Sequence, residues 1–345
     1  MAKIHFSKLK IKDLENIFQE NNIPKYRGKQ VFEGIYNHFA PSFDHINNIP
    51  KDLKLFLNQN IDSDIPKIVE KSTSPDGTCK YLLRLQDNNL IECVYLPYQK
   101  RNSLCISTQI GCPVGCVFCA SGAHGFVRNH NVWEIIGQLL AVQGDIKEKL
   151  THIVYMGIGE PLLNLDNVVS SLKLINENFK ISERRITVST SGITSQIYKL
   201  ADYKLDITLA LSLHSPFQEE REKLIPTAGR NPIQKLFLAC DDYFKKTKRR
   251  ITWEYILIKD INSDEYHAKE LSKLAKKYKA HINLIPCNKT DNYNHNAPSE
   301  KEIKIFTGIL EKNKVEWTLR QKKGQNENSA CGQLRANHLN EYENL

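Results

Sequence analysis

Three closely spaced cysteines are the residues of this sequence best suited to chemistry. Cys112, Cys116 and Cys119 occupy the segment CPVGCVFC, so three thiolates can reach one centre from a single loop. A closed zinc site needs four ligands, whereas a four-iron cluster held by three cysteines keeps one iron open to a further ligand. The spacing therefore favours an iron–sulfur cluster, and a zinc site completed by His124 is the alternative.

A glycine turn follows the second predicted strand of the large domain, residues 152–156. Residues 156–161 read MGIGEP, which lacks the third glycine of a dinucleotide-binding turn, and Glu160 would repel a phosphate. An acidic side chain beside Gly159 suits a cationic ligand instead. An ordinary strand-to-helix turn is the alternative.

Polar side chains also stand where three other predicted strands end. They are Ser189 on the third strand, Ser212, Leu213 and His214 on the fourth, and Asn288 after the sixth. Barrel folds build their sites at the carboxyl ends of parallel strands, so we expect these groups to share one rim with the cysteine loop. Taken singly, such serines are ordinary turn residues and His214 would be a structural histidine.

The remaining cysteines divide into reactive and packing residues. Cys331 lies in the polar segment SACGQ, where a thiol is better explained as reactive than as buried. Cys105 lies seven residues before Cys112 in a predicted strand, and by itself would be a buried strand residue. We assign the others to packing: Cys79, Cys93, Cys240 and Cys287.

Alternating strands and amphipathic helices position these residues. From about residue 103, seven predicted strands cover residues 104–107, 152–156, 186–190, 207–213, 251–258, 282–286 and 315–320. Repeated strand–helix units predict a parallel sheet with helices outside it, in a barrel-like or a doubly wound α/β fold. Before them, a period of two predicts a hairpin at 79–85 and 90–96, and helical spacing predicts a small helical unit over residues 1–60.

The composition is that of a globular protein with a basic balance of charge. Among 345 residues, 48 are Lys or Arg and 39 are Asp or Glu, so the net charge is 48 − 39 = +9, which permits an RNA partner. No apolar run approaches the ~20 residues that cross a bilayer, and the first residues lack an apolar signal segment. We therefore expect a cytoplasmic protein with no membrane partner, whose nine cysteines serve metal or redox chemistry.

The cysteine spacing resembles the cluster motif of the radical S-adenosylmethionine (SAM) superfamily. Further segments resemble one family within it, the RlmN/Cfr family of RNA methyltransferases. In chain order they are YRGKQ (26–30), IECVYLP (91–97), CISTQIGC (105–112), GIGEPLLN (157–164), RITVSTSG (185–192), LSLH (211–214), INLIP (282–286) and ACGQ (330–333). The resemblance covers nearly the whole chain.

This resemblance implies a fold with four parts. A partial (β/α)6 TIM-like barrel, the radical SAM core, would span residues 98–325. An N-terminal helical RNA-binding domain would span residues 1–60, and a β-hairpin linker residues 61–97. A C-terminal loop and tail, residues 326–345, would carry Cys331.

The resemblance also implies an activity. Members methylate carbon-2 of an adenosine in the peptidyl-transferase centre of 23S rRNA and of the adenosine 3′ to the anticodon in tRNAs. The reaction would use one 4Fe–4S cluster, two SAM molecules per turnover, and an electron donor of the flavodoxin or ferredoxin type. The implied cluster ligands are Cys112, Cys116 and Cys119.

Roles for individual residues follow from the same resemblance. Cys331 would carry a methyl group, Cys105 would release the product through a transient disulfide with Cys331, and Glu92 would accept a proton. The implied SAM contacts are Gly159, Glu160, Ser189, Ser212, Leu213, His214 and Asn288. Two alternatives stay open: methylation at carbon-8 of an rRNA adenosine, as in Cfr, and a non-catalytic zinc-binding RNA-binding protein.

Overall fold

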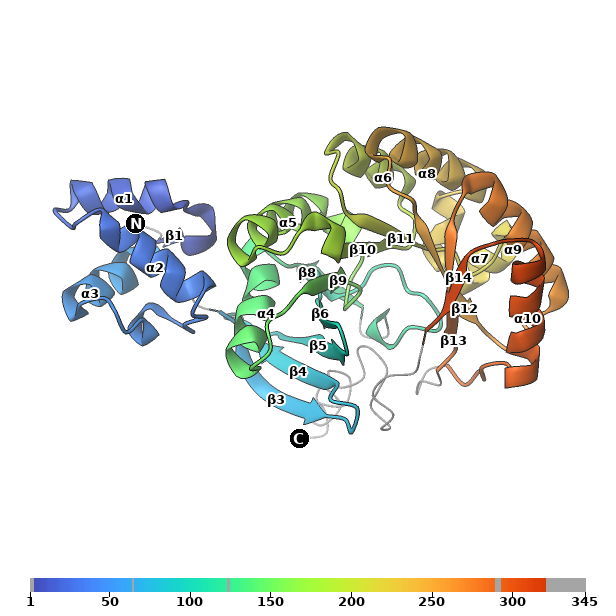
Figure 1. The fold of residues 1–345 in the computed structure, drawn as a ribbon, viewed down its shortest axis with the longest axis horizontal. Coiled ribbons are helices and arrows are strands. Elements are labelled where there is room, and N and C mark those ends of the chain that lie inside the picture. Colours follow the sequence, from blue (N-terminus) through green and yellow to red (C-terminus); the bar gives the residue numbers. More distant parts are fainter. Residues whose placement is uncertain (1–2, 64, 123–124, 289–292, 321–345) are drawn as a thin grey trace.

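A single mixed sheet organises the computed structural model, which describes residues 3–63, 65–122, 125–288 and 293–320. Within these ranges ten strands pair in the order β14-β13-β12-β11-β10-β9-β6-β5-β4-β3 (Figure 1). Seven neighbours in this order run parallel: β6 (Arg101–Cys105), β9 (His152–Tyr155), β10 (Ile186–Thr190), β11 (Thr208–Ser212), β12 (Thr252–Leu257), β13 (His281–Pro286) and β14 (Trp317–Leu319).

Six helices alternate with the parallel strands and cover their outer side (Figure 1). They are α4 (Val132–Asp145), α5 (Leu165–Phe179), α6 (Thr194–Asp202), α8 (Ile233–Thr247), α9 (Glu265–Tyr278) and α10 (Glu300–Lys312). The parallel strands follow one another in chain order across the sheet, whereas a doubly wound fold reverses its strand order at a switch point. The partial (β/α)6 barrel is therefore confirmed, and the doubly wound alternative is wrong.

The two faces of the barrel strands differ in character. On β12, Trp253 stacks against Phe237 at 5.1 Å between ring centroids, and Tyr255 lies 5.7 Å from Phe306; both partners belong to the surrounding helices. Because successive side chains of a strand point to opposite faces, Glu254 between them points into the barrel. Polar residues on the inner face can thus approach a ligand while the outer face packs the core.

An antiparallel extension continues the same sheet before the barrel begins. It consists of β3 (Lys67–Thr73), β4 (Cys79–Arg84) and β5 (Leu90–Tyr98), and β5 pairs antiparallel with β6. The predicted hairpin corresponds to β4 and β5. The sequence analysis did not predict β3, because all seven of its residues are exposed and its side chains carry no alternation of burial.

The N-terminal helices pack on the barrel helices through aromatic side chains. They are α1 (Ile11–Glu20), α2 (Tyr26–Tyr36) and α3 (Lys51–Asn60), flanked by the short paired strands β1 (Ile4–His5) and β2 (Ile61–Asp62). Phe6 lies 6.0 Å from Trp133 of α4, and Tyr36 lies 5.6 Å from Phe179 of α5, between ring centroids. The helical unit predicted for residues 1–60 consists of these three helices.

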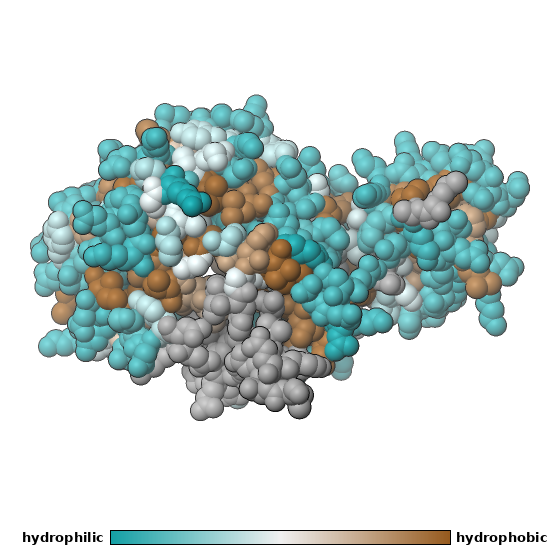
Figure 2. Space-filling model, turned by 180° about the vertical axis from the view of Figure 1, so that it is seen from behind, coloured by the Kyte–Doolittle hydropathy of each residue, from teal (hydrophilic) through white to brown (hydrophobic). Residues whose placement is uncertain are grey.

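In the part of the chain that the structure describes, none of the helices combines the length and the apolar character needed to cross a bilayer. Hydrophilic residues cover most of the face shown in Figure 2.

Candidate functional site

The three-cysteine segment is a loop that begins at a small hairpin. Strands β7 (Gln109–Gly111) and β8 (Phe126–Asn129) pair antiparallel, and the amide of Cys112 donates to the carbonyl of Gly125 at 3.1 Å. Gly111 has φ +73°, and a Cβ there would lie 1.7 Å from the Gly125 oxygen. Only glycine fits this crossing, so the hairpin starts the loop in a fixed direction.

The far side of the loop rests on helix α7 (Gln218–Leu224). The amide of Val117 donates to the carbonyl of Leu224 at 3.1 Å. Leu224 and Ile225 belong to a small apolar cluster against which Cys112 and Cys116 pack. The loop is therefore held at both ends, by the hairpin and by α7.

The sulfur of Cys119 lies close enough to Cys112 and Cys116 to act on both of those thiols. Burial raises the pKa of Cys112 to about 12 and raises the pKa of Cys116, and the neighbouring thiols and Glu160 add to both shifts. Thiols with high pKa values bind metal by exchanging their protons for it. All three cysteines are half-buried, so they stay accessible to an incoming cofactor.

Three cysteines on one loop are one ligand short of a closed zinc site, which needs four. His124, the fourth ligand of the zinc alternative, lies outside the described residues. Three thiols can each hold one iron of a four-iron cluster and leave the fourth iron open to a further ligand.

Glu160 faces the same region from a tight glycine turn after β9. A Cβ on Gly157 would lie 2.7 Å from the backbone of Ile106, and Gly159 has φ +109°. The Glu160 carboxylate accepts hydrogen bonds from the amides of Ser191 at 2.6 Å and Leu162 at 3.0 Å. Burial raises its pKa, and the two amides favour the ionised form. A buried carboxylate in this place suits a cationic amino group.

A hydrogen-bond network joins this turn to the strands beside it. The hydroxyl of Ser107 donates to the carbonyl of Glu92 at 2.6 Å and accepts from the amide of Ile158 at 2.9 Å. The Gln138 side chain accepts a hydrogen bond from the amide of Ser107 and donates one to the carbonyl of Ser107, each at 2.9 Å. Neither Ser107 nor Gln138 was singled out in the sequence, since a polar residue that bonds only to backbone leaves no spacing signal.

Glu92 and Cys105 lie on neighbouring strands and share the inner face of the sheet. Their chain neighbours Cys93 and Leu104 belong to the outer core, and Glu92 and Cys105 do not. Val94 pairs with Cys105 in the register of β5 and β6, which brings the two functional candidates within two positions of each other. Burial raises the pKa of Cys105 to about 11, so this residue is a protonated thiol at neutral pH.

The predicted SAM contacts lie at the carboxyl ends of β10, β11 and β13. Ser189 and Ser212 are half-buried, Leu213 is buried, and Asn288 is exposed directly after β13. The rim they form also carries the Glu160 turn after β9. Whether these residues contact SAM stays a prediction.

His214 has a structural role in this rim. Its Nδ1 accepts from the amide of Ile256 at 3.1 Å, and its ring meets the edge of Phe118 in the cysteine loop at 4.8 Å. Burial lowers its pKa to about 3, so the ring is neutral. The imidazole therefore fixes the loop against β12, and any contact with SAM would come from its backbone or from Nε2.

Two buried ionisable residues of the rim and lumen were missed in the sequence. Arg221 is 0% exposed and donates to the carbonyls of Ser191 and Ser212. In the polar run QEEREKL it is indistinguishable from a surface charge. Glu254 is buried inside the barrel, where Asn283 donates to it at 2.7 Å. A glutamate between Trp253 and Tyr255 in an apolar strand was a signal that could have found it.

The remaining cysteine predictions concern Cys331 and the four cysteines assigned to packing. Cys331 lies outside the described residues, as does the segment 326–345 expected to carry it. The eight cysteines that the structure does describe are all free, so no resting disulfide joins them. The four cysteines assigned to packing are buried, as expected: Cys79, Cys93, Cys240 and Cys287.

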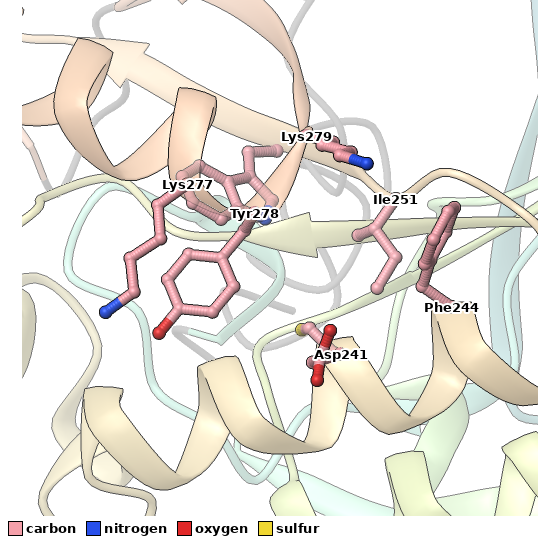
Figure 3. Close-up of a pocket in the computed structure, with 8 residues that line it drawn as sticks. Asp241, Phe244, Ile251, Lys277, Tyr278 and Lys279 are labelled. Carbon is pink, nitrogen blue, oxygen red and sulfur yellow. The ribbon is translucent and has the colours of Figure 1, made fainter.

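A pocket at the opposite end of the strands is separate from this site (Figure 3). It opens beside Ile251, which precedes β12, and Lys279, which precedes β13. Figure 3 shows Asp241 and Phe244 on one side and Tyr278 with the flanking lysines on the other. The candidate site lies at the carboxyl ends of the same strands, so the pocket takes no part in it.

The chain is similar to known proteins along nearly its whole length. The family model of the Radical SAM superfamily matches residues 106–271, and that of the ribosomal RNA large subunit methyltransferase N-terminal domain matches residues 4–62. A relative from Clostridium novyi with the name "Probable dual-specificity RNA methyltransferase RlmN" is 44% identical over 330 residues, covering 95% of this chain and 96% of that protein. One of Trichodesmium erythraeum is 42% identical, with 96% of each covered. The crystal structure of a radical SAM methyltransferase from Sphaerobacter thermophilus superposes with a TM-score of 0.90 at 35% identity, covering 96% of this chain and 98% of that one.

Proposed function

The chain belongs to the RlmN family of RNA methyltransferases in the radical SAM superfamily, and we propose that it methylates carbon-2 of adenosine in RNA through a methyl group carried on Cys331. The proposed targets are one adenosine in the peptidyl-transferase centre of 23S rRNA and the adenosine 3′ to the anticodon of tRNAs. Membership of the superfamily implies a 4Fe–4S cluster and SAM. The proposed place of action is the cytoplasm.

One observation carries the proposal. The cysteine loop, the buried Glu160 and the pair Glu92 and Cys105 all belong to one end and one inner face of the same barrel. A cofactor on the loop, an amino group at Glu160 and a base between the inner strands would then be neighbours. Separate sites for the same residue types would give no such convergence.

The target atom explains the need for this cofactor. Carbon-2 of adenine bears an aromatic hydrogen that is neither acidic nor nucleophilic, so ordinary polar methyl transfer fails. When bound, the cluster supplies the electron that cleaves SAM and generates a 5′-deoxyadenosyl radical. In the chain itself, Cys112, Cys116 and Cys119 would hold the cluster and Glu160 would orient the amino group of SAM.

Three residues would handle the methyl group and the protons. Cys331 would accept a methyl group from one SAM, and the radical from a second SAM would take a hydrogen atom from that methyl group. After the carbon joins the base, Glu92 would accept the proton from carbon-2. Cys105 would attack the sulfur of Cys331 as the carbon–sulfur bond breaks, and the released carbon would take up a proton to complete the methyl group. The unpaired electron left by the radical addition would return to the cofactor, leaving a transient disulfide and free methylated RNA. An electron donor of the flavodoxin or ferredoxin type would return the enzyme to its starting state.

The protonation of Cys105 fits a late role. Its thiol is buried, with a pKa raised to about 11, so it stays unreactive toward oxidants and alkylating agents while the earlier steps take place. Thiol–disulfide exchange needs the thiolate. The charge of Glu92 also raises the pKa of Cys105.

Comparing cysteine variants tests the division of labour. Cys331→Ala should give neither protein methylation nor a link to RNA. Cys105→Ala should start the reaction and stall as enzyme joined to RNA, seen as a slow band on a denaturing gel that RNase collapses. Cys93→Ala, which alters a buried cysteine on the outer face of the adjacent strand, is the matched control and should turn over normally.

Two results would contradict the proposal. If Cys105→Ala and Cys331→Ala behave alike, with no crosslink from either, the assigned roles of the two thiols are wrong. If nucleoside mass spectrometry of the product finds 8-methyladenosine in place of 2-methyladenosine, the reaction belongs to the carbon-8 branch.

A further inference from the structure

A buried arginine without an acidic partner lies between the cysteine loop and the rim. Arg221 of α7 is 0% exposed. Among the described residues it forms no ion pair, and its Nε and Nη1 have no hydrogen-bond partner. Burial lowers its pKa only to about 10, so the guanidinium is charged at neutral pH. A buried charge without a counter-charge is costly, and this cost needs an explanation.

The surrounding backbone is shaped to receive the guanidinium. Nη2 donates to the carbonyl of Ser191 and, at 3.4 Å, to that of Ser212. Gly192 has φ +100°, and a Cβ there would lie 3.0 Å from Nη2. Ser191 also donates its amide to Glu160. The arginine is thus fixed against the same turn that holds the Glu160 carboxylate.

The neighbouring acid on α7 is engaged elsewhere. Glu220 accepts from the hydroxyl of Ser215 at 2.7 Å and contacts Nε2 of His267 at 2.8 Å. These bonds tie the outer side of α7 to α9. Because adjacent helical residues are about 100° apart around the axis, they also direct Arg221 away from α9 and toward the rim.

The loop that α7 supports is the one that carries the cysteines. The Val117 amide is bonded to Leu224, three residues after Arg221, and Cys116 packs on the same apolar cluster as Leu224. The charge of Arg221 acts on the Cys116 thiol, where it opposes the effects of burial, of Cys119, of Cys112 and of Glu160. The arginine and the support of the cysteine loop therefore belong to the same short helix, three residues apart.

We propose that Arg221 is the counter-charge of the iron–sulfur cluster and raises its reduction potential. The inference rests on the proposed placement of the cluster on Cys112, Cys116 and Cys119. Reduction adds a negative charge to the cluster, so a buried cation beside it stabilises the reduced form more than the oxidised form. Net charge and hydrogen bonds to the sulfurs are established controls of cluster potential. Arg221 would thus ease the electron uptake that must precede SAM cleavage.

The test is a redox titration of the anaerobic holoenzyme without SAM, followed by electron paramagnetic resonance. Arg221→Met should lower the equilibrium constant for cluster reduction about tenfold, a shift of 59 mV for one electron. Arg221→Lys keeps a charge with fewer donors, and its potential should lie between the two. The lysine variant also carries the test if the methionine variant does not fold.

A matched control comes from the other end of the barrel. Arg249 also donates to a strand carbonyl, that of Ile207, at 3.4 Å, but it lies before β12 at the amino ends of the strands. Arg249→Met should leave the cluster potential unchanged. Iron and sulfide content is measured for every protein, so that a loss of cluster is not mistaken for a change of potential.

Each other outcome overturns the inference in a distinct way. An unchanged potential with weaker SAM binding would show that Arg221 pairs with the SAM carboxylate instead. An unchanged potential with lower stability in urea would show that it serves only the carbonyls of Ser191 and Ser212. A wild-type protein without iron would defeat the proposed function itself, and the inference with it.

Discussion

Replacing Glu254 with glutamine is expected to stabilise the protein more at pH 8.5 than at pH 5. Burial raises the pKa of Glu254 from its ordinary value of 4.5 to about 7. The folded protein therefore binds this proton more tightly than the unfolded chain does. Stability falls as the pH rises from about 4.5 to about 7, because folding then opposes ionisation.

The size of the effect follows from the two pKa values. One pKa unit corresponds to about 1.4 kcal/mol, so ionisable Glu254 lowers the free energy of unfolding by about 1 kcal/mol at pH 5 and about 3 kcal/mol at pH 8.5. Glutamine removes the charge and keeps an acceptor for Asn283. The side-chain oxygen of Asn283 accepts a hydrogen bond from the hydroxyl of Thr318 at 3.0 Å. This bond keeps the amide nitrogen of Asn283 directed at residue 254, so the glutamine must offer its oxygen there.

Urea denaturation of both proteins at the two pH values measures the difference. Glu177→Gln, a change at an exposed glutamate of α5, is the control and should leave the two curves together. If the wild-type and Glu254→Gln stabilities change in parallel between pH 5 and pH 8.5, the burial argument for Glu254 is wrong. Glu254 lowers the free energy of unfolding at neutral and higher pH. A carboxyl group with this effect on the inner face of the barrel is expected to serve function rather than packing.

Further predictions concern the loop and the RNA contact. Alanine at Cys112, Cys116 or Cys119 should abolish iron binding and SAM cleavage. Full iron content in any one of these variants would contradict the assignment of the three cysteines as cluster ligands. Gly111→Ala should cost at least about 1–3 kcal/mol in unfolding free energy and reduce iron loading, because the new Cβ would meet the Gly125 oxygen. Gly115→Ala, with a similar φ but nothing within 4 Å, should cost less, and equal losses would refute the steric reason. RNA binding should weaken with salt, and the slope of log affinity against log salt concentration should fall in magnitude by about 0.9 for each phosphate contact removed. Filter binding of alanine variants at Lys25, Arg27 and Lys29 measures this slope.

The barrel could be predicted because its strands are buried on a regular pattern. Residues 186–190 were predicted as a strand and are β10 to the residue. Alternating helices and strands left only the barrel or the doubly wound order, and the pairing of strands, which no local pattern contains, decided between them. Strand β3 escaped because both of its faces are exposed, so it lacks the alternation on which strand prediction depends.

The site was partly predictable for a related reason. Cysteines and glycines can be recognised by their spacing in the sequence, as in the loop from Cys112 and the turn at Gly159. Arg221 and Gln138 act through contacts with distant backbone, and charge or polarity in a helix normally indicates solvent exposure. His214 was correctly placed on the rim, but its bond to Ile256, which joins residues far apart in the chain, could only come from the fold.

The aromatic contacts between the N-terminal helices and the barrel make the two parts poor candidates for separation. Cutting the chain near residue 60 would remove the aromatic cover that Phe6 gives Trp133 and that Tyr36 gives Phe179, and would expose the facing sides of Phe6 and Tyr36. Both fragments would then expose large apolar rings and tend to aggregate. A chimaera that exchanges these helices for those of a relative should therefore also transplant the facing residues of α4 and α5, and the two surfaces are expected to change together during evolution.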